Sequence, residues 1–380
     1  MKKLLFLIFI LLFPNCSFDN KSGIWNNNSK RNNSVNNVLK DFKSFEKSEK
    51  KIFTKKIKLD ENYKFDTSEI YKNNFWNEKY FSEGNIISNF LYNDTNKPIH
   101  KSKKISRYKI NETLLFSNNF VITSDTKGNI IVYSLKEKKI ISKYNFYKKK
   151  FRNIKKKLNI ILEKEIVYIA DNIGFLYCYD LINNNIVWAK KYNVPFRSNI
   201  KIKDNMIFIA NQNNNLIIAD KKDGNMIKRI PTEEVLVKND YINSLSLNDK
   251  NIFFLNTFGS IYSINLKSLK IDWFLNINSA VDNSLSSLFN AKTLKVTNDK
   301  IIVSSNENFS VFDTKTAMTN YNLPLVSKSE PIINNNHVFT ITHNNYLVCL
   351  NLENGKIIYS FSIEDKIADY LNSKKSSLNL

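Results

Sequence analysis

Apolar and polar positions follow one another in a fixed order that recurs six times between Asn111 and Ile363. Each copy holds an apolar run, a polar turn, a second apolar run ending in a short polar residue, a second turn and a third apolar run. The second runs with the turns that follow them are VYSLKEKKIIS (132–142), CYDLINNNIVW (178–188), IADKKDGNMIK (218–228), SINLKSLKIDW (263–273), VFDTKTAMTNY (311–321) and CLNLENGKIIY (349–359). Because all six align without an insertion or a deletion, we interpret them as an internal repeat.

The apolar runs are predicted to be β-strands. The first runs IVYIA (166–170), MIFIA (206–210) and NIFFL (251–255) are short and rich in Ile, Val and Phe. Successive copies begin between 37 and 49 residues apart, and all-strand repeats of this length are typical of β-propeller blades. Residues 111–363 contain no sustained apolar stripe of period 3.6, which disfavours a parallel α/β fold and a helical solenoid.

Two positions of the repeat are expected to shape each blade. The first is a Ser, Asp or Asn that ends the second run, and its side chain is expected to bond the backbone of the following turn. The second lies eight residues later and is aromatic in four of the six copies. These rings are expected to pack between blades, where they bury a large area at little entropic cost. The first position holds Ser134, Asp180, Asp220, Asn265, Asp313 and Asn351, and the second holds Ser142, Trp188, Lys228, Trp273, Tyr321 and Tyr359.

The loose pattern Asp-x-x-x-Gly-x-x-x-Trp, visible in DLINNNIVW (180–188) and NLENGKIIY (351–359), resembles a known repeat. It is similar to the PQQ-type propeller repeat, which quinoprotein dehydrogenases share with the outer membrane protein assembly factor BamB. The resemblance covers roughly residues 75–363, although Gly fills the turn position only in Gly224 and Gly355. It implies an all-β fold, a β-propeller of four-stranded PQQ-like blades. Six repeats are readable, and the eight blades of the BamB family imply seven or eight blades in a complete ring.

The N-terminus has the form of a lipoprotein signal. Lys2 and Lys3 precede a ten-residue apolar run at 4–13, which is too short to span a bilayer, so residues 1–15 are predicted to be a signal peptide. Cys16 follows and resembles a lipobox cysteine, although Pro14 and Asn15 are atypical before it. We predict lipid attachment at Cys16, with plain secretion and a stray cysteine as alternatives. Ser17 is compatible with sorting to the periplasmic face of the outer membrane.

Two further segments frame the repeats. Residues 16–58 are rich in Asn, Ser and Lys and are predicted to be a disordered tether. Residues 59–380 are predicted to form a single propeller domain, in which 59–110 supply a partial blade whose outer strand comes from the C-terminus. The segment at 367–380 offers at most one strand of a further blade, so the C-terminal blade is predicted to be truncated or strongly degenerate.

The charge of the chain is strongly positive. It holds 57 Lys and Arg against 35 Asp and Glu, a formal charge of +22 that is compatible with nucleic acid or anionic lipid as a partner. However, Lys, Asn, Ile, Phe and Tyr are all abundant while Gly and Pro are scarce, as expected from an AT-rich genome. The basic runs at 148–150 and 155–157 are interpreted as solvated loops, and no nucleic-acid partner is predicted.

Candidate chemistry is sparse. His100, His337 and His343 have no neighbours at metal-ligand spacing, and no motif of a catalytic nucleophile is present. Cys178 and Cys349 share one repeat position, so they are expected to be core thiols of separate blades rather than a disulfide. The adjacent cysteines common in quinoprotein dehydrogenases are missing. We therefore predict no catalytic residue, no cofactor and no metal, and we do not expect an enzyme.

Two functions remain open on the sequence. The resemblance to BamB implies a scaffold lipoprotein that supports assembly and insertion of β-barrel proteins. Its expected partners are the periplasmic domains of a subunit of the outer-membrane barrel-assembly machinery, together with the membrane through the lipid anchor. The alternative is a propeller that binds a small molecule or polymer in its central channel, for which polar groups gathered at one mouth would be the indicator.

Overall fold

The computed structural model describes residues 53–71, 75–91, 100–117, 119–234, 242–278 and 288–377. The chain divides into the units Met1–Glu49 and Lys50–Leu380, of which only the second contains described residues. The predicted signal peptide, Cys16 and most of the predicted tether therefore lie outside the described residues.

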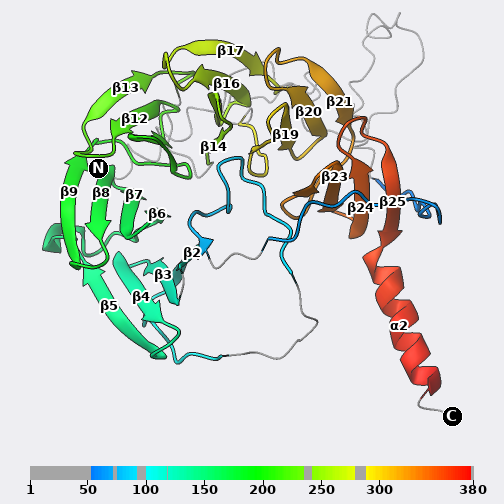
Figure 1. Cartoon of the computed structure of the whole chain (residues 1–380), viewed down its shortest axis with the longest axis horizontal. Coiled ribbons are helices and arrows are strands. Elements are labelled where there is room, and N and C mark those ends of the chain that lie inside the picture. The colour runs from blue at the N-terminus through cyan, green and yellow to red at the C-terminus, as the bar shows by residue number, and fades with distance from the viewer. Residues whose placement is uncertain are drawn as a thin grey trace, which may run out of the picture. The chain divides into compact units, whose positions relative to one another are not determined.

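Six antiparallel sheets follow one another around a common centre in the unit Lys50–Leu380 (Figure 1). Each contains four strands paired in chain order, and the first has a short extra strand, β1 (Phe75–Trp76), at its inner edge. Blade 1 is β2 (Ile110–Ser117), β3 (Phe120–Asp125), β4 (Asn129–Ser134) and β5 (Lys139–Asn145); blade 2 is β6 (Leu158–Glu163), β7 (Ile166–Asp171), β8 (Phe175–Asp180) and β9 (Asn185–Lys191); blade 3 is β10 (Lys201–Lys203), β11 (Met206–Ala210), β12 (Leu216–Asp220) and β13 (Met226–Ile230). Blade 4 is β14 (Ser244–Leu247), β15 (Asn251–Leu255), β16 (Ser260–Asn265) and β17 (Ile271–Asn276); blade 5 is β18 (Lys295–Val296), β19 (Lys300–Ser304), β20 (Phe309–Asp313) and β21 (Thr319–Leu323); blade 6 is β22 (Ile332–Asn334), β23 (His337–Ile341), β24 (Tyr346–Asn351) and β25 (Ile357–Ser362). The predicted propeller of four-stranded blades is confirmed.

The repeat extends to strand register. In every blade the third and fourth strands pair with a bulge directly after the residue opposite the second repeat position. Cys178 lies opposite Trp188, for example, and Ser263 lies opposite Trp273. A bulge adds local twist to a strand. It thereby turns the outermost strand of each blade in the same way.

The hydrophobic core lies between blades. The second and third strands of a blade are apolar on both faces because a neighbouring blade covers each face. One cluster joins Leu158 and Ile169 of blade 2 to Ile130 of blade 1, and equivalent clusters join each later pair of neighbours. The outermost strands alternate between exposed and half-buried residues.

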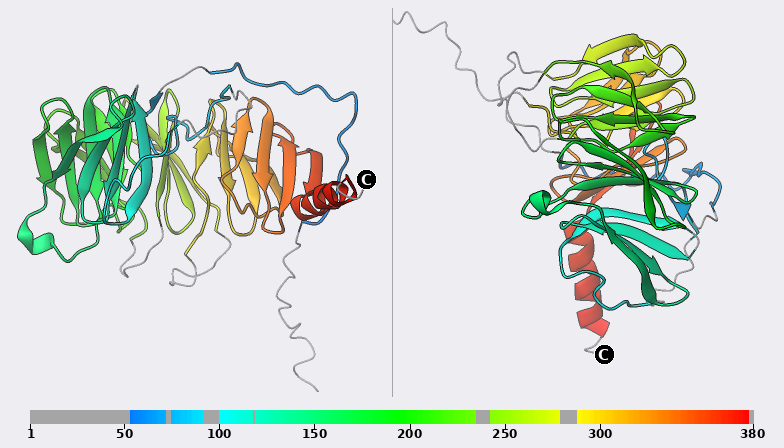
Figure 2. Two further views of the ribbon diagram at one scale, coloured as in Figure 1. Left: turned by 90° about the horizontal axis from the view of Figure 1, so that it is seen from below. Right: turned by 90° about the vertical axis from the view of Figure 1, so that its left-hand side faces the viewer.

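The two ends of the described unit differ from the prediction. The prediction allowed at most one strand at 367–380, and within the described residues Ile363–Ser377 form helix α2, which follows β25 directly (Figure 2). The start of the unit also differs, because Ile57 pairs with Ser360 on the outer edge of β25 and Phe53 packs in the core of blade 6. Residues at the end of the predicted tether thus contact blade 6.

The described residues of 59–110 do not form the expected partial blade. Their strand pairing is limited to β1 and an isolated bridge between Tyr71 and Phe90. The described part of the apolar run, 86–91, is consequently not a blade strand. Residues 77–86, which overlap the start of this run, instead bond to the inner strands of several blades.

Candidate functional site

The short polar residues of the repeat close the hairpin between the third and fourth strands of each blade. In all six copies the side chain accepts a backbone N–H two or three residues further on, as expected for Asx and Ser turns. Asp313 Oδ1, for instance, accepts from Lys315 N at 2.9 Å and from Thr316 N at 2.8 Å. The Thr316 and Lys315 N–H groups favour the charged form of this carboxyl, so its pKa lies below the usual value.

The second repeat position connects neighbouring blades. Trp188 Nε1 donates to Lys221 O at 3.2 Å, and Trp273 Nε1 donates to Thr314 O at 3.1 Å. Each acceptor belongs to the outer hairpin of the next blade. Other residues at the second repeat position also donate a hydrogen bond to the outer hairpin of the next blade. The pairs are Ser142 Oγ with Asn184 Oδ1, Lys228 Nζ with Leu269 O, and Tyr321 OH with Leu352 O.

The backbone conformation and close contacts of the two turn glycines explain why glycine occurs at this position of the repeat. Gly224 and Gly355 have φ of +71° and +70°, a backbone conformation that side chains disfavour. A Cβ on Gly224 would lie 2.5 Å from Trp188 Cζ3, and one on Gly355 would lie 2.7 Å from Tyr321 Cδ2. The ring of one blade therefore rests on the bare backbone of the next blade's turn.

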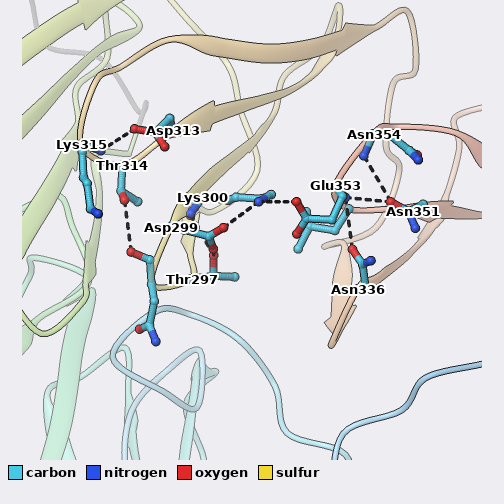
Figure 3. A network of polar contacts seen from close by, with 12 residues as sticks. Thr297, Asp299, Lys300, Asp313, Thr314, Lys315, Asn336, Asn351, Glu353 and Asn354 are labelled. Carbon is cyan, nitrogen blue, oxygen red and sulfur yellow. Dashed lines mark hydrogen bonds and ion pairs between the residues drawn. The ribbon is translucent and has the colours of Figure 1, made fainter.

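Charged groups reinforce this contact between blades 5 and 6 (Figure 3). Lys300 is almost fully buried, and its Nζ lies 2.7 Å from both Asp299 Oδ2 and Glu353 Oε2. Glu353 belongs to the outer hairpin of blade 6, whereas Lys300 begins β19 of blade 5. The repeat positions and this ion pair therefore act in holding blades together.

A segment of the chain lies at the centre of the blades. Residues 77–86, here called the plug, bond the inner strands of blades 2, 4 and 5 near their C-terminal ends. Leu162 N donates to Asn77 O at 2.8 Å, and Leu247 N donates to Glu83 O at 2.9 Å. Val296 N donates to Gly84 O at 2.9 Å. The plug thus ties the inner strands of three blades together at the centre.

A buried ion pair anchors the plug to blade 3. Lys201 Nζ donates to Glu78 Oε2 and, at 2.7 Å, to Ser82 O. The two side chains are 1% and 10% exposed. Burial raises the pKa of Glu78 and lowers the pKa of Lys201, while the attraction between the two charges acts against both shifts. Lys203 and Glu83 form a second, more exposed pair at 2.8 Å.

The other end of the plug reaches between blades 4 and 5. Asn85 is fully buried, and its Nδ2 donates to Leu245 O at 2.8 Å and to Leu294 O at 2.6 Å. The buried Lys295 donates to Asn85 O at 2.9 Å. Gly84 permits this approach, because a Cβ there would lie 2.2 Å from Val296 O.

One mouth of the channel is basic. A cavity of about 620 Å³, here called the pit, lies where the inner strands begin, and Lys79 and Tyr80 of the plug contribute to its lining. Seven lysine and arginine residues and two glutamates line it: Lys79, Lys109, Lys155, Lys156, Lys157, Arg197, Lys292, Glu112 and Glu330. The run 155–157, interpreted from sequence as a solvated loop, thus lies at a concave site.

His100, His337 and the two core cysteines have structural surroundings. His337 bonds Tyr63 OH at 2.8 Å and Asp66 O at 3.0 Å, and His100 bonds Tyr133 OH at 2.9 Å. Cys178 and Cys349 are free and buried, as predicted. Burial raises their thiol pKa values to about 11 and about 12, which makes them poor nucleophiles. The described residues contain no group of three or more His, Cys, Asp or Glu placed to hold a metal ion.

The polar turn, the bulge and the ring between blades recur from blade to blade. Together they place the fold in the class of propellers built from PQQ-type repeats. A family model described as outer membrane protein assembly factor BamB matches residues 160–361, more than half of the chain, and the chain belongs to that family. The crystal structure of BamB from Moraxella catarrhalis superposes with a TM-score of 0.55 at 13% identity, covering 66% of this chain and 75% of that one. At this identity the similarity shows the fold alone.

A second solved structure superposes less well on this chain. The β-propeller domain of Myceliophteria thermophila Cps50 (Swd1) aligns with a TM-score of 0.47 at 12% identity, covering 69% of this chain and 89% of that domain. No curated protein matches the sequence. Within the described residues, no helix is both long and apolar enough to cross a membrane.

Proposed function

We propose that this protein is a non-enzymatic scaffold lipoprotein that supports assembly and insertion of β-barrel proteins into the outer membrane. The observation that carries the proposal is the match of residues 160–361 to the BamB family. A rigid disc of blades can present loops or strand edges to a partner without any catalytic residue. The proposed partner is a periplasmic domain of the barrel-assembly machinery.

Anchoring at Cys16 is part of the same proposal. Acyl chains on this residue would hold the protein at the periplasmic face of the outer membrane, and residues up to about 52 would separate it from the bilayer. This arrangement keeps the scaffold near the membrane even when no partner is bound.

The test is affinity purification of tagged full-length protein from membranes solubilised in mild detergent. We expect near-stoichiometric recovery of a barrel-assembly subunit. Cys16→Ser should move the protein to the soluble fraction, whereas the neighbouring change Ser17→Ala should leave it on the membrane. Recovery of the protein alone from solubilised membranes that contain the machinery would refute the scaffold function.

A channel that binds a ligand remains the second candidate, favoured by the basic lining of the pit. The plug bears on this candidate because two of its residues, Lys79 and Tyr80, line the pit.

A further inference from the structure

The pit differs from the basic loops of the surface in being concave, and Lys79 and Tyr80 of the plug form part of its lining. Its volume of about 620 Å³ lies within the range of about 300–1,000 Å³ usual for ligand sites. Charges of one sign around a low-dielectric concavity reinforce one another, so an anion is attracted more strongly there than on a flat surface.

The two carboxylates in the pit are already engaged. Glu112 lies 3.4 Å from Lys79, and Glu330 accepts from Thr293 N at 3.2 Å. Glu330 also lies 3.7 Å from the buried Lys295. By contrast, Lys109, Lys155 and Lys292 form no ion pair with any described residue.

Polar side chains of a second kind accompany the cations. Six asparagines line the pit: Asn111, Asn159, Asn172, Asn199, Asn243 and Asn256. Asn243 is 1% exposed, and its Nδ2 donates to Asn211 O at 2.9 Å. Its buried Oδ1 has no partner within the described part of the chain, so it is an acceptor that needs an N–H or O–H donor.

The lysines and the unpartnered Asn243 Oδ1 together favour some anionic ligands over others. Carboxylate and phosphate oxygens satisfy lysines equally well, but fully ionised they offer no hydrogen to the Asn243 acceptor. A polypeptide supplies both groups, because its backbone N–H donates while its acidic side chains accept. No lining residue is a glycine, so a glycine-rich phosphate cradle is not present in the pit.

We propose that the pit receives an acidic segment of a partner polypeptide, with its carboxylates on Lys109, Lys155 and Lys292 and a backbone N–H on Asn243 Oδ1. The inference rests on the proposed scaffold function only for the identity of the partner, and binding of an acidic peptide is independent of it.

The test uses purified soluble protein and a fluorescein-labelled, end-capped hexa-aspartate peptide, followed by fluorescence anisotropy at low salt. The variant Lys109→Glu/Lys155→Glu reverses two exposed charges of the pit. Lys148→Glu/Lys150→Glu makes the same change in net charge on exposed residues outside it. We expect the pit variant to weaken binding by about tenfold or more, and the control variant by less than about twofold.

Three outcomes would overturn the inference. Equal losses in both variants would mean that net charge alone attracts the peptide. Equal binding of a hexa-asparagine peptide would remove the role of the carboxylates. Displacement of the peptide by tripolyphosphate at a lower concentration than by unlabelled hexa-aspartate would assign the pit to inorganic polyanions.

The two proposals fail separately. If hexa-aspartate does not bind but a barrel-assembly subunit still co-purifies with the full-length protein, the pit inference is wrong and the scaffold stands. If the peptide binds and no such subunit co-purifies, the pit remains an acidic-peptide site and the scaffold function is wrong.

Discussion

Breaking the ion pair between Lys201 and Glu78 tests whether the plug is part of the folded core. Lys201→Met removes an ammonium whose side chain is 1% exposed and leaves the Glu78 carboxylate buried without its partner. Removing one member of a buried pair costs about 3–5 kcal/mol. The lost bond to Ser82 O adds about 1 kcal/mol. We expect a total loss of roughly 4–6 kcal/mol at pH 8.

The loss should depend on pH in a definite direction. Burial already raises the pKa of Glu78 in the wild-type protein, and removal of the Lys201 charge raises it further. A carboxyl with a raised folded pKa binds its proton more tightly when folded than when unfolded. Its cost is therefore small below the unfolded pKa of about 4.3 and grows as pH rises through the folded value. Lys201→Met should be more damaging at pH 8 than at pH 5.

The double variant Glu78→Gln/Lys201→Met is the matched control, because it leaves no buried charge. Replacement of a whole buried pair is often close to neutral, so the double variant should recover most of the stability lost in Lys201→Met. Urea unfolding followed by tryptophan fluorescence measures all three proteins. A loss below about 1 kcal/mol for Lys201→Met, or a double variant as unstable as the single one, would refute the proposed burial of the plug.

Three further changes probe other contacts. Trp273→Ala should cost about 3 kcal/mol in urea unfolding, whereas Trp273→Phe should cost about 1 kcal/mol because mainly the bond to Thr314 O is lost. Gly84→Ala places a methyl group on Val296 O, so tryptic cleavage after Lys79 should become faster as the plug loosens. Asp313 has a lowered folded pKa, so its contribution is present above the unfolded pKa of about 3.9 and is lost as pH falls below it. The melting temperature of the wild type should therefore approach that of Asp313→Asn between pH 6 and pH 3.

Each of these three predictions has an outcome that would contradict it. Equal losses for the two Trp273 variants would assign the contact to the N–H group and not to the ring. Unchanged cleavage in Gly84→Ala would show that the plug tolerates a side chain at its closest approach. A pH-independent difference between the wild type and Asp313→Asn would mean that the carboxyl is not titrating in its turn.

The blades could be predicted from sequence because their determinants are local. A strand pair, its turn residue and its bulge all lie within about fifteen residues, and six copies reinforce one pattern. The hairpin position of Asp180 and the interblade position of Trp188 followed from that alignment. The helix at the C-terminus was missed although its signal was present: Ser362 Oγ caps the N–H of Asp365, and Ile363, Ile367, Tyr370 and Leu371 recur at helical spacing.

The plug and the pit could not be predicted in this way. Glu78 meets Lys201 across 123 residues, and Lys295 meets Asn85 across 210, with no repeat to indicate either pairing. The lysine run 155–157 looks the same in sequence as 148–150, yet only the former lines the cavity. What separates them is the position of each run relative to the inner strands, which depends on the assembled blades.

The charges at the plug and in the pit differ in how they are paired. Glu78 and Glu83 pair with Lys201 and Lys203 where the plug meets blade 3. In the pit, Lys109, Lys155 and Lys292 lack such partners among the described residues. These unpaired cations therefore lie on the side where the inner strands begin. If the pit binds an acidic segment as proposed, the orientation of the scaffold on its partner would follow from their position, because complementary charge sets orientation as well as attraction.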